Sequence, residues 1–131
     1  MSGLLLDTSA YSLMAGGHEP AGDLVRAASF VAVTPVVVGE LLAGFDRGTR
    51  SDWNRARLAA FLAHSSVRVL LVDAGTAERY AAIVNALRNR GRPAPTNDIW
   101  IAASAMQHGL PILTADVHFS EIPQIQVRML Q

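Results

Sequence analysis

The amino-acid sequence predicts an α/β protein whose mostly parallel sheet is covered by helices on both faces. Short apolar runs alternate along the chain with longer segments of helical spacing, and this alternation is typical of βαβ units. The first run, LLL at residues 4–6, is continuously apolar, as expected for a strand of a parallel sheet that is buried on both faces. The chain is long enough for one hydrophobic core, so we expect a single domain over residues 1–131.

The first half of the chain carries signals for where helices begin and end. Gly16 and Gly17 end a helix that starts directly after the first strand, and Thr34-Pro35 provides a cap and a first-turn proline for a later helix. In chain order, we expect a strand at 4–6, helices at 8–15 and about 21–28, a strand at 30–33, and helices from 35 to about 45 and at 51–63.

The second half continues the same alternation. Gly91 and Gly109 follow two further helices, and Pro93 and Pro95 interrupt the chain between them. We expect a strand at 67–72, helices at 77–90 and 97–108, and strands at 111–114 and 125–129. The helix at 97–108 is apolar around most of its circumference, which predicts a central position in the fold.

Composition excludes several kinds of protein. The chain contains no cysteine, which excludes disulfides, thiolate zinc sites and cysteine nucleophiles. All 11 basic residues are arginine, and P-loops and receiver-type phosphoacceptor domains both need a lysine. No apolar stretch approaches the roughly 18 to 20 residues of a membrane helix, and no basic segment precedes the first apolar run. We therefore expect a cytoplasmic protein without a membrane segment.

The hydrophobic content indicates a protein that associates with partners. Hydrophobic residues make up 50% of the chain and its mean hydropathy is +0.25, which is high for a small monomer. Surplus apolar surface is usually covered by a partner, so we expect an oligomer or a tight complex. The net charge is zero, so the overall charge gives no sign of nucleic-acid binding.

Four acidic side chains stand out from the rest by their apolar surroundings. They are Asp7 in LLLD, Glu40 in VVVGELLAG, Asp98 in TNDIWIAASA and Asp116 in PILTADVHF. Asp7 lies at the carboxyl end of the first strand, where open α/β sheets bind ligands, but it also precedes a helix, where Asp is a preferred cap. Taken singly, Asp98 is explained as well by a favourable interaction with the helix dipole as by a function, and Asp116 is explained by an ordinary turn.

Glu40 is informative because the helix around it has a core stripe with i, i+3, i+4, i+7 spacing. The stripe consists of Val38, Leu41, Leu42 and Phe45. We expect Glu40 to point away from this stripe, on a face that carries Val36, Ala43 and Gly44. Such a small, apolar face packs against another element or lines a groove, and the alternative is a solvated surface glutamate.

Taken together, the four acids favour a metal site. Two strand ends and two helix starts each present one carboxylate to the same edge of a parallel sheet, where carboxylates repel one another unless a cation neutralises them. Acidic oxygens without His or Cys are the ligands of Mg²⁺ or Mn²⁺, and Thr8, Ser9 and Thr114 add hydroxyls suited to orienting ligands or water. A site of this kind hydrolyses phosphate esters with the help of the metal.

The chain resembles PIN-domain ribonucleases, and most closely the VapC-type toxins of toxin–antitoxin pairs. The resemblance covers essentially the whole length and rests on LLLDTSAYS, VTPVVVGELLAG and GRPAPTNDIWIAASAMQHGLPILTADVHF, in this order. It matches a catalytic acidic quartet that binds Mg²⁺ or Mn²⁺ with Asp7, Glu40, Asp98 and Asp116, and supporting hydroxyls with Thr8 and Thr114. Many relatives carry a further Asp or Asn near the position of Val117 or His118. This chain lacks that residue, which bears on whether a second metal binds.

The resemblance implies a three-layer α/β/α PIN-like fold, homodimers, and Mg²⁺- or Mn²⁺-dependent cleavage of structured RNA such as tRNA or rRNA. It also implies a toxin that inhibits translation and a cognate antitoxin that inhibits the toxin. Two alternatives remain open, a PIN nuclease for RNA maturation or for DNA, and a non-catalytic PIN binding module. The retention of all four acids argues against the binding module, because an inactive scaffold has no reason to keep mutually repelling charges.

Basic and aromatic residues supply further candidates. Arg90 and Arg92 precede the Asp98 segment and are candidate contacts to RNA phosphates, with a solvated helix end as the alternative. The arginines at 47, 50, 55 and 57 are weaker candidates for the same contact. His118 is a candidate proton donor or an ordinary loop histidine. Trp53 and Trp100 are predicted to pack in the core rather than to stack on bases.

Overall fold

Five short parallel strands form the centre of the fold. The computed structural model describes residues 3–131. The strands are β1 (Leu4–Leu6), β2 (Val31–Val33), β3 (Val67–Val69), β4 (Ile112–Thr114) and β5 (Val127–Met129), and they pair in the order β3-β2-β1-β4-β5. Every pair is parallel, so the sheet that was predicted to be mostly parallel is entirely so within the described residues.

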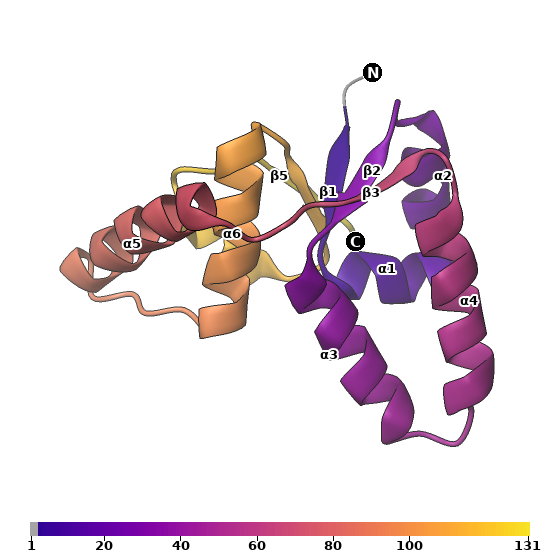
Figure 1. The fold of residues 1–131 in the computed structure, drawn as a ribbon. Coiled ribbons are helices and arrows are strands. Elements are labelled where there is room, and N and C mark those ends of the chain that lie inside the picture. Colours follow the sequence, from indigo (N-terminus) through magenta and orange to yellow (C-terminus); the bar gives the residue numbers. More distant parts are fainter. Residues whose placement is uncertain (1–2) are drawn as a thin grey trace.

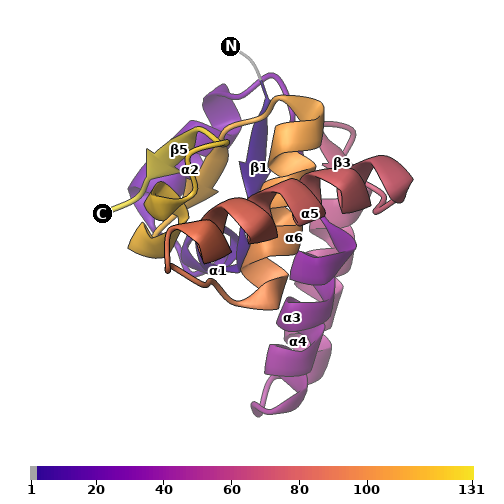
Figure 2. The ribbon, with the colours of Figure 1, turned by 90° about the vertical axis from the view of Figure 1, so that its left-hand side faces the viewer.

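Helices cover both faces of this sheet, which confirms the predicted three-layer α/β/α architecture. They are α1 (Thr8–Ala15), α2 (Glu19–Ala27), α3 (Pro35–Asp46), α4 (Ser51–Ala63), α5 (Ala74–Asn89), α6 (Thr96–His108) and the 3-10 helix η1 (Val117–Glu121). Figure 1 shows α5 and α6 on one side of the sheet and α1, α2 and α4 on the other. In both views, α3 and α4 form a hairpin that extends away from the sheet (Figure 1, Figure 2). None of the helices in residues 3–131 has the length and apolar character needed to cross a bilayer.

The continuous apolar run of β1 is explained by burial on both faces. Leu5 is fully buried in the cluster that contains Ile83 of α5 and Ile101 of α6. Leu4 and Leu6 belong to the opposite cluster, together with small residues of α1 and α2. Because successive side chains of a strand point to opposite faces, both faces of β1 contribute apolar side chains to the core.

Three boundaries differ from the sequence-based expectation, two of them for an evident physical reason. The helix expected at 77–90 begins earlier, at Ala74, because Asp73 and Thr76 form a capping box at its start. The strand expected at 67–72 ends at Val69. In the described sheet β3 pairs with β2, which ends at Val33, and the following Leu71 is 73% exposed. The last strand is also shorter than expected and begins at Val127.

The two tryptophans lie in different environments. Trp100 is half-buried and stacks on Tyr80 with ring centroids 4.1 Å apart, in agreement with a packing role. Trp53 is 48% exposed, so the prediction that it packs in the core was wrong. The reason is its place on α4, the outer helix of the α3–α4 hairpin, which buries only Leu58 fully.

Candidate functional site

Asp7 is both the residue at the carboxyl end of a strand and the cap of a helix, the two alternatives that the sequence left open. It follows β1 directly and is also the N-cap of α1, where its Oδ1 accepts a hydrogen bond of 2.8 Å from the backbone N–H of Ala10. The side chain is nearly inaccessible, with 4% relative exposure. Burial raises the pKa of Asp7, hydrogen bonds from Thr114, Ala10 and Ser9 lower it, and the charge of Asp116 raises it further; the pKa is raised overall.

Two hydroxyl groups hold the Asp7 carboxylate in place. Thr114 Oγ1, at the end of β4, donates to Asp7 Oδ2 at 2.5 Å, and Ser9 Oγ donates to Asp7 Oδ1 at 2.7 Å. Ser9 Oγ also accepts from the backbone N–H of Ala115 at 3.0 Å, and Thr114 Oγ1 accepts from the backbone N–H of Asp116 at 2.9 Å. These bonds couple the end of β1 to the turn that carries Asp116, so the two hydroxyls fix the relative positions of two acids.

Glu40 is held by residues from two other helices. Its Oε1 accepts a hydrogen bond of 2.7 Å from Thr8 Oγ1 on α1, and its Oε2 accepts one of 3.4 Å from Asn97 Nδ2 on α6. The half-buried carboxylate therefore lies where α1, α3 and α6 meet. The alternative of an ordinary solvated glutamate does not fit these contacts.

The buried face of α3 differs from the predicted stripe. Val37 and Leu41 are its fully buried residues, whereas Val38, Leu42 and Phe45 are only half-buried. On a helical wheel Val37 lies about 60° from Glu40. Glu40 therefore lies at the edge of the buried face, on a side of α3 that packs against other elements as expected, while the buried stripe itself is centred on Val37 and Leu41 and not on the four predicted residues.

Asp98 shows that the four acids act on one another. It lies in the first turn of α6 and is half-buried. Its pKa is raised to about 6, first by burial and then by the charges of Asp116, Glu40 and Asp7. His118 has the opposite, smaller effect on this pKa. Because a charge acts on a pKa only from nearby, the side chains of Asp116, Glu40 and Asp7 lie in the neighbourhood of Asp98.

Asp116 begins η1 and is paired with His118. Its Oδ1 accepts from the backbone N–H of His118 at 2.9 Å and lies 2.8 Å from the Nδ1 of the same residue. The imidazole is largely exposed. His118 thus lies at the edge of the acidic cluster, close enough to orient the Asp116 carboxylate, and its role as a proton donor stays a prediction.

The donor set fits a hard cation that keeps part of its water shell. The cluster consists of carboxylate and hydroxyl oxygens, the donors preferred by Mg²⁺ and Mn²⁺. Within residues 3–131, no three His, Asp or Glu side chains converge closely enough to form a ready-made ion site. Mg²⁺ usually binds through one or two carboxylates and several waters, so the spacing and the donor chemistry suit a hydrated ion better than a closed cage.

Comparisons with known proteins identify the family to which this arrangement belongs. The family model described as "PIN domain" matches residues 4–125. The chain belongs to the PIN-domain family. The domain is 31% identical over 118 residues to ribonuclease VapC5 of Mycobacterium tuberculosis, an alignment that covers 90% of this chain and 86% of the relative.

Solved structures have the same fold as this PIN domain. VapBC2 from Rickettsia felis, solved with a DNA fragment from its promoter, superposes with a TM-score of 0.85 at 19% identity and covers 98% of this chain and 99% of its own. VapC20 of M. tuberculosis, described as a toxin that cleaves the sarcin–ricin loop, gives a TM-score of 0.73 at 25% identity and covers 95% of this chain and 98% of its own. The comparisons confirm the predicted family and the resemblance to VapC toxins.

Sequence reasoning missed part of the polar network of the PIN domain. The hydroxyl of Ser9 was noted beside the acids, but its link between Asp7 and the β4 turn was not foreseen. Asn97 was overlooked as a partner of Glu40, although its position directly before Asp98 in the first turn of α6 is a usable signal. Both contacts join residues far apart in the chain, which residue spacing alone does not predict.

The two arginines proposed to bind RNA lie outside the hydrogen-bonded network of the acids. Arg90 is the C-cap of α5 and is exposed. The Nη1 of Arg92 forms an ion pair of 3.0 Å with the Oε1 of Glu121 on η1. The ion pair ties the loop before α6 to η1, and contact of either arginine with RNA stays a prediction.

Proposed function

We propose that this PIN domain is a Mg²⁺- or Mn²⁺-dependent endoribonuclease that acts as the toxin of a toxin–antitoxin pair. The observation that carries the proposal is the cluster around Asp98, whose pKa is raised to about 6 by burial and by three other acids. Carboxylates gathered in this way destabilise a protein when no cation is bound. The similarity to ribonuclease VapC5 and to the toxin VapC20 supports RNA as the substrate.

The four acids would hold the ion and the neighbouring polar groups would position the acids. We assign the ligand role to Asp7, Glu40, Asp98 and Asp116. A bound Mg²⁺ or Mn²⁺ supplies a water of lowered pKa and neutralises charge on the phosphate that is attacked. Within the chain, Thr8 and Asn97 hold the Glu40 carboxylate by hydrogen bonds. Thr114 and Ser9 hold the Asp7 carboxylate, so that both acids keep their orientation when no ion is bound.

The same comparison supports a class of substrate. We assign structured RNA, either tRNA or rRNA, as the target, with inhibition of translation in the cytoplasm as the result. The experiment is cleavage of purified tRNA and rRNA by the protein in Mg²⁺, in Mn²⁺ and in EDTA. We expect cleavage at discrete sites with either metal and none in EDTA.

Paired variants give this test its control. Asp98→Asn should abolish cleavage, because it removes one of the proposed ligands. Asp52→Asn should cleave at the wild-type rate, because Asp52 is an exposed acid in the first turn of α4. Full activity in EDTA with verified metal removal would contradict the mechanism. Cleavage of DNA in preference to RNA would instead support the alternative of a different PIN nuclease.

We also assign a cognate antitoxin and a homodimer as partners. The supporting observation for the antitoxin is the similarity to VapC toxins, together with a cluster of carboxylates that would attract a basic side chain. Expression of this chain should inhibit growth, and co-expression of the small protein encoded beside it should restore growth. Equal inhibition with and without that protein would contradict the toxin–antitoxin assignment.

A further inference from the structure

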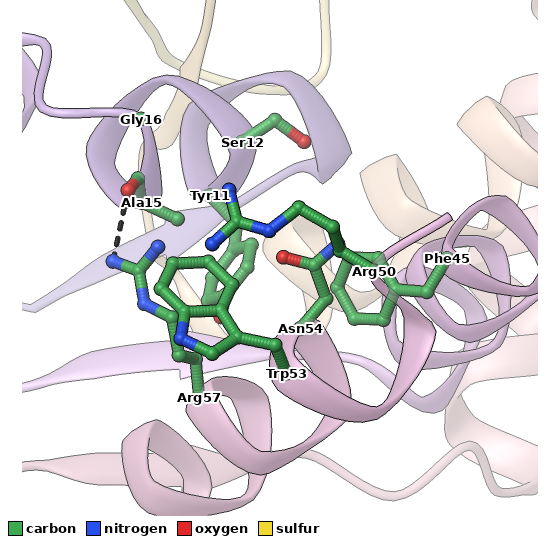
Figure 3. A pocket seen from close by; sticks show the side chains of 9 residues that line it. All are labelled: Tyr11, Ser12, Ala15, Gly16, Phe45, Arg50, Trp53, Asn54 and Arg57. Carbon is green, nitrogen blue, oxygen red and sulfur yellow. Dashed lines mark hydrogen bonds between the residues drawn. The ribbon is translucent and has the colours of Figure 1, made fainter. Parts of the chain in front are cut away.

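A pocket of about 380 Å³ lies between α1, α3 and α4, outside the acidic cluster. Figure 3 shows the ring of Trp53 at its centre, with Arg50 and Arg57 reaching over it from the same helix region. The guanidinium carbon of Arg50 lies 3.9 Å from the centroid of the Trp53 ring, and that of Arg57 lies 4.6 Å from it. The partial exposure of Trp53 is thus explained by a cation–π cluster and not by loose packing.

The two guanidinium groups are held in place by these contacts. Arg57 Nη2 also donates a hydrogen bond of 2.8 Å to the backbone carbonyl oxygen of Ala15, at the end of α1. A stacked arginine has lost part of its side-chain freedom before any ligand arrives, so binding an anion costs less entropy. The pocket therefore presents two positive charges at defined positions.

These charges are not neutralised by the protein. The neighbouring Arg55 forms an ion pair with Asp46, with Nη2 and Oδ2 2.8 Å apart. Within residues 3–131, Arg50 and Arg57 form no ion pair, and no acidic side chain lines the pocket. The pocket is therefore suited to an anionic ligand.

Helix capping does not account for Arg50. It occupies the N-cap position of α4 and makes no capping hydrogen bond with its side chain. Ser, Thr, Asp and Asn are preferred at this position, and a positive charge there opposes the helix dipole. An arginine is therefore unfavourable as a cap at this position, and the contact that its guanidinium group makes instead is the stacking on Trp53, which places the charge over the pocket.

The pocket continues from the acidic cluster along two helices. On α1, Thr8 binds Glu40, and Ser12, one turn later, lines the pocket. On α3, Phe45, five residues after Glu40, also lines the pocket. At 1.5 Å per residue, the pocket lining begins about 6 to 8 Å along these two helices from the Thr8–Glu40 hydrogen bond, so a nucleic-acid strand bound at the acids passes close to the pocket.

We infer that the pocket formed by Arg50, Trp53 and Arg57 binds the phosphate backbone of the substrate RNA next to the bond that is cleaved. The inference rests on the proposed function, since it takes RNA as the substrate of the acidic cluster. It assigns the backbone contact to the α3–α4 hairpin, whereas the sequence had favoured Arg90 and Arg92. Trp53 acts as a positioning residue that holds the two arginines.

The test measures binding of a structured RNA in EDTA, where the RNA stays intact. Arg50→Gln should weaken binding several-fold at low salt and should reduce the slope of log affinity against log salt by about 0.7, the value for one single-stranded phosphate contact. Trp53→Leu should also weaken binding although it removes no charge, because it releases both guanidinium groups. Arg55→Gln is the matched control with the same charge change on the same helix, and it should bind nearly as wild type.

Further readouts separate the pocket from the rest of the protein. Thermal melting should show that Arg50→Gln remains folded, since Arg50 makes no side-chain capping bond. Wild-type affinity of both pocket variants would overturn the inference while leaving metal-dependent cleavage intact. Loss of binding to the co-expressed small protein with unchanged RNA binding would make the pocket a protein interface and would also overturn it. Absence of RNA cleavage by the wild type in Mg²⁺ and Mn²⁺ would contradict the proposed function itself, independently of the binding series.

Discussion

Asp98→Asn should stabilise the metal-free protein at neutral pH and not at acidic pH. The pKa of Asp98 is about 6 in the folded protein against the ordinary value of 3.8, so its charged form is better tolerated in the unfolded chain. The resulting penalty is full above pH 6, decreases as the pH falls through 6, and disappears below about pH 4. At roughly 1.4 kcal/mol per pKa unit, the ceiling is about 3 kcal/mol. Because Asp98 is only half-buried and water screens its charge, we expect about 1 to 2 kcal/mol.

The assay is thermal or urea-induced unfolding in EDTA at pH 7.5 and at pH 4. For a domain of this size, 1 kcal/mol corresponds to roughly 4 °C in Tm. Asp52→Asn is the control, since it removes an exposed acid from a first helical turn and should lose only about 0.3 to 1 kcal/mol of dipole stabilisation. A stabilisation by Asp98→Asn of equal size at both pH values, or a destabilisation at pH 7.5, would refute the reasoning that burial and the neighbouring acids raise the pKa of Asp98.

Three further predictions concern the metal, the polar network and association. Asp7→Asn should keep the cap of α1, since Asn caps as well as Asp. The variant should lose most of the stabilisation that a bound metal gives, which in the wild type is expected to be about 2.7 kcal/mol at a metal concentration of 100 times Kd. Melting with and without Mn²⁺ measures this, and equal shifts in both proteins would return Asp7 to the role of a cap alone. Ser9→Ala should lower the free energy of unfolding by about 1 to 3 kcal/mol and weaken metal binding, because the buried Asp7 carboxylate loses a hydrogen-bond donor. Ser12→Ala, on the exposed face of α1, is the control and should be nearly neutral when melting is measured over the same series of metal concentrations. Sedimentation at micromolar concentration should show a dimer, and a monomer there would leave the exposed side chain of Leu71 and the apolar surplus without a partner.

The order and type of the elements could be predicted because the apolar pattern of each one is local. Leu4 to Leu6 are buried on both faces, and this is already visible as a continuous apolar run. Where elements end depends on neighbours that the pattern does not contain. The apolar residues Leu71 and Val72 continue the run after β3, but β2 has already ended and no backbone partner remains for them in the described sheet.

The candidate site was predictable in its acids and not in its surroundings. Parallel strands bring their carboxyl ends to one edge, so Asp7 and Asp116 had to approach each other whatever the details of packing. The exposure of Trp53 could not be predicted, because it results from the way the α3–α4 hairpin extends away from the sheet. This tertiary feature leaves one face of α4 without a packing partner. Helical spacing identifies such a face as apolar and carries no information on whether anything packs against it.

The bond between Thr114 and Asp7 joins residues 107 positions apart in the chain, and this has a consequence for protein synthesis. Chains emerge from the ribosome N-terminus first, at about 5 to 20 residues per second, so Asp7 is made seconds before β4 can insert beside β1. During that interval the carboxylate has neither the hydroxyl of Thr114 nor the neighbouring Asp116, and the acidic cluster does not exist. A nascent or prematurely terminated chain that stops before β4 therefore lacks the complete cluster, and under the proposed function it cannot cleave RNA. The cluster is complete only in nearly finished molecules.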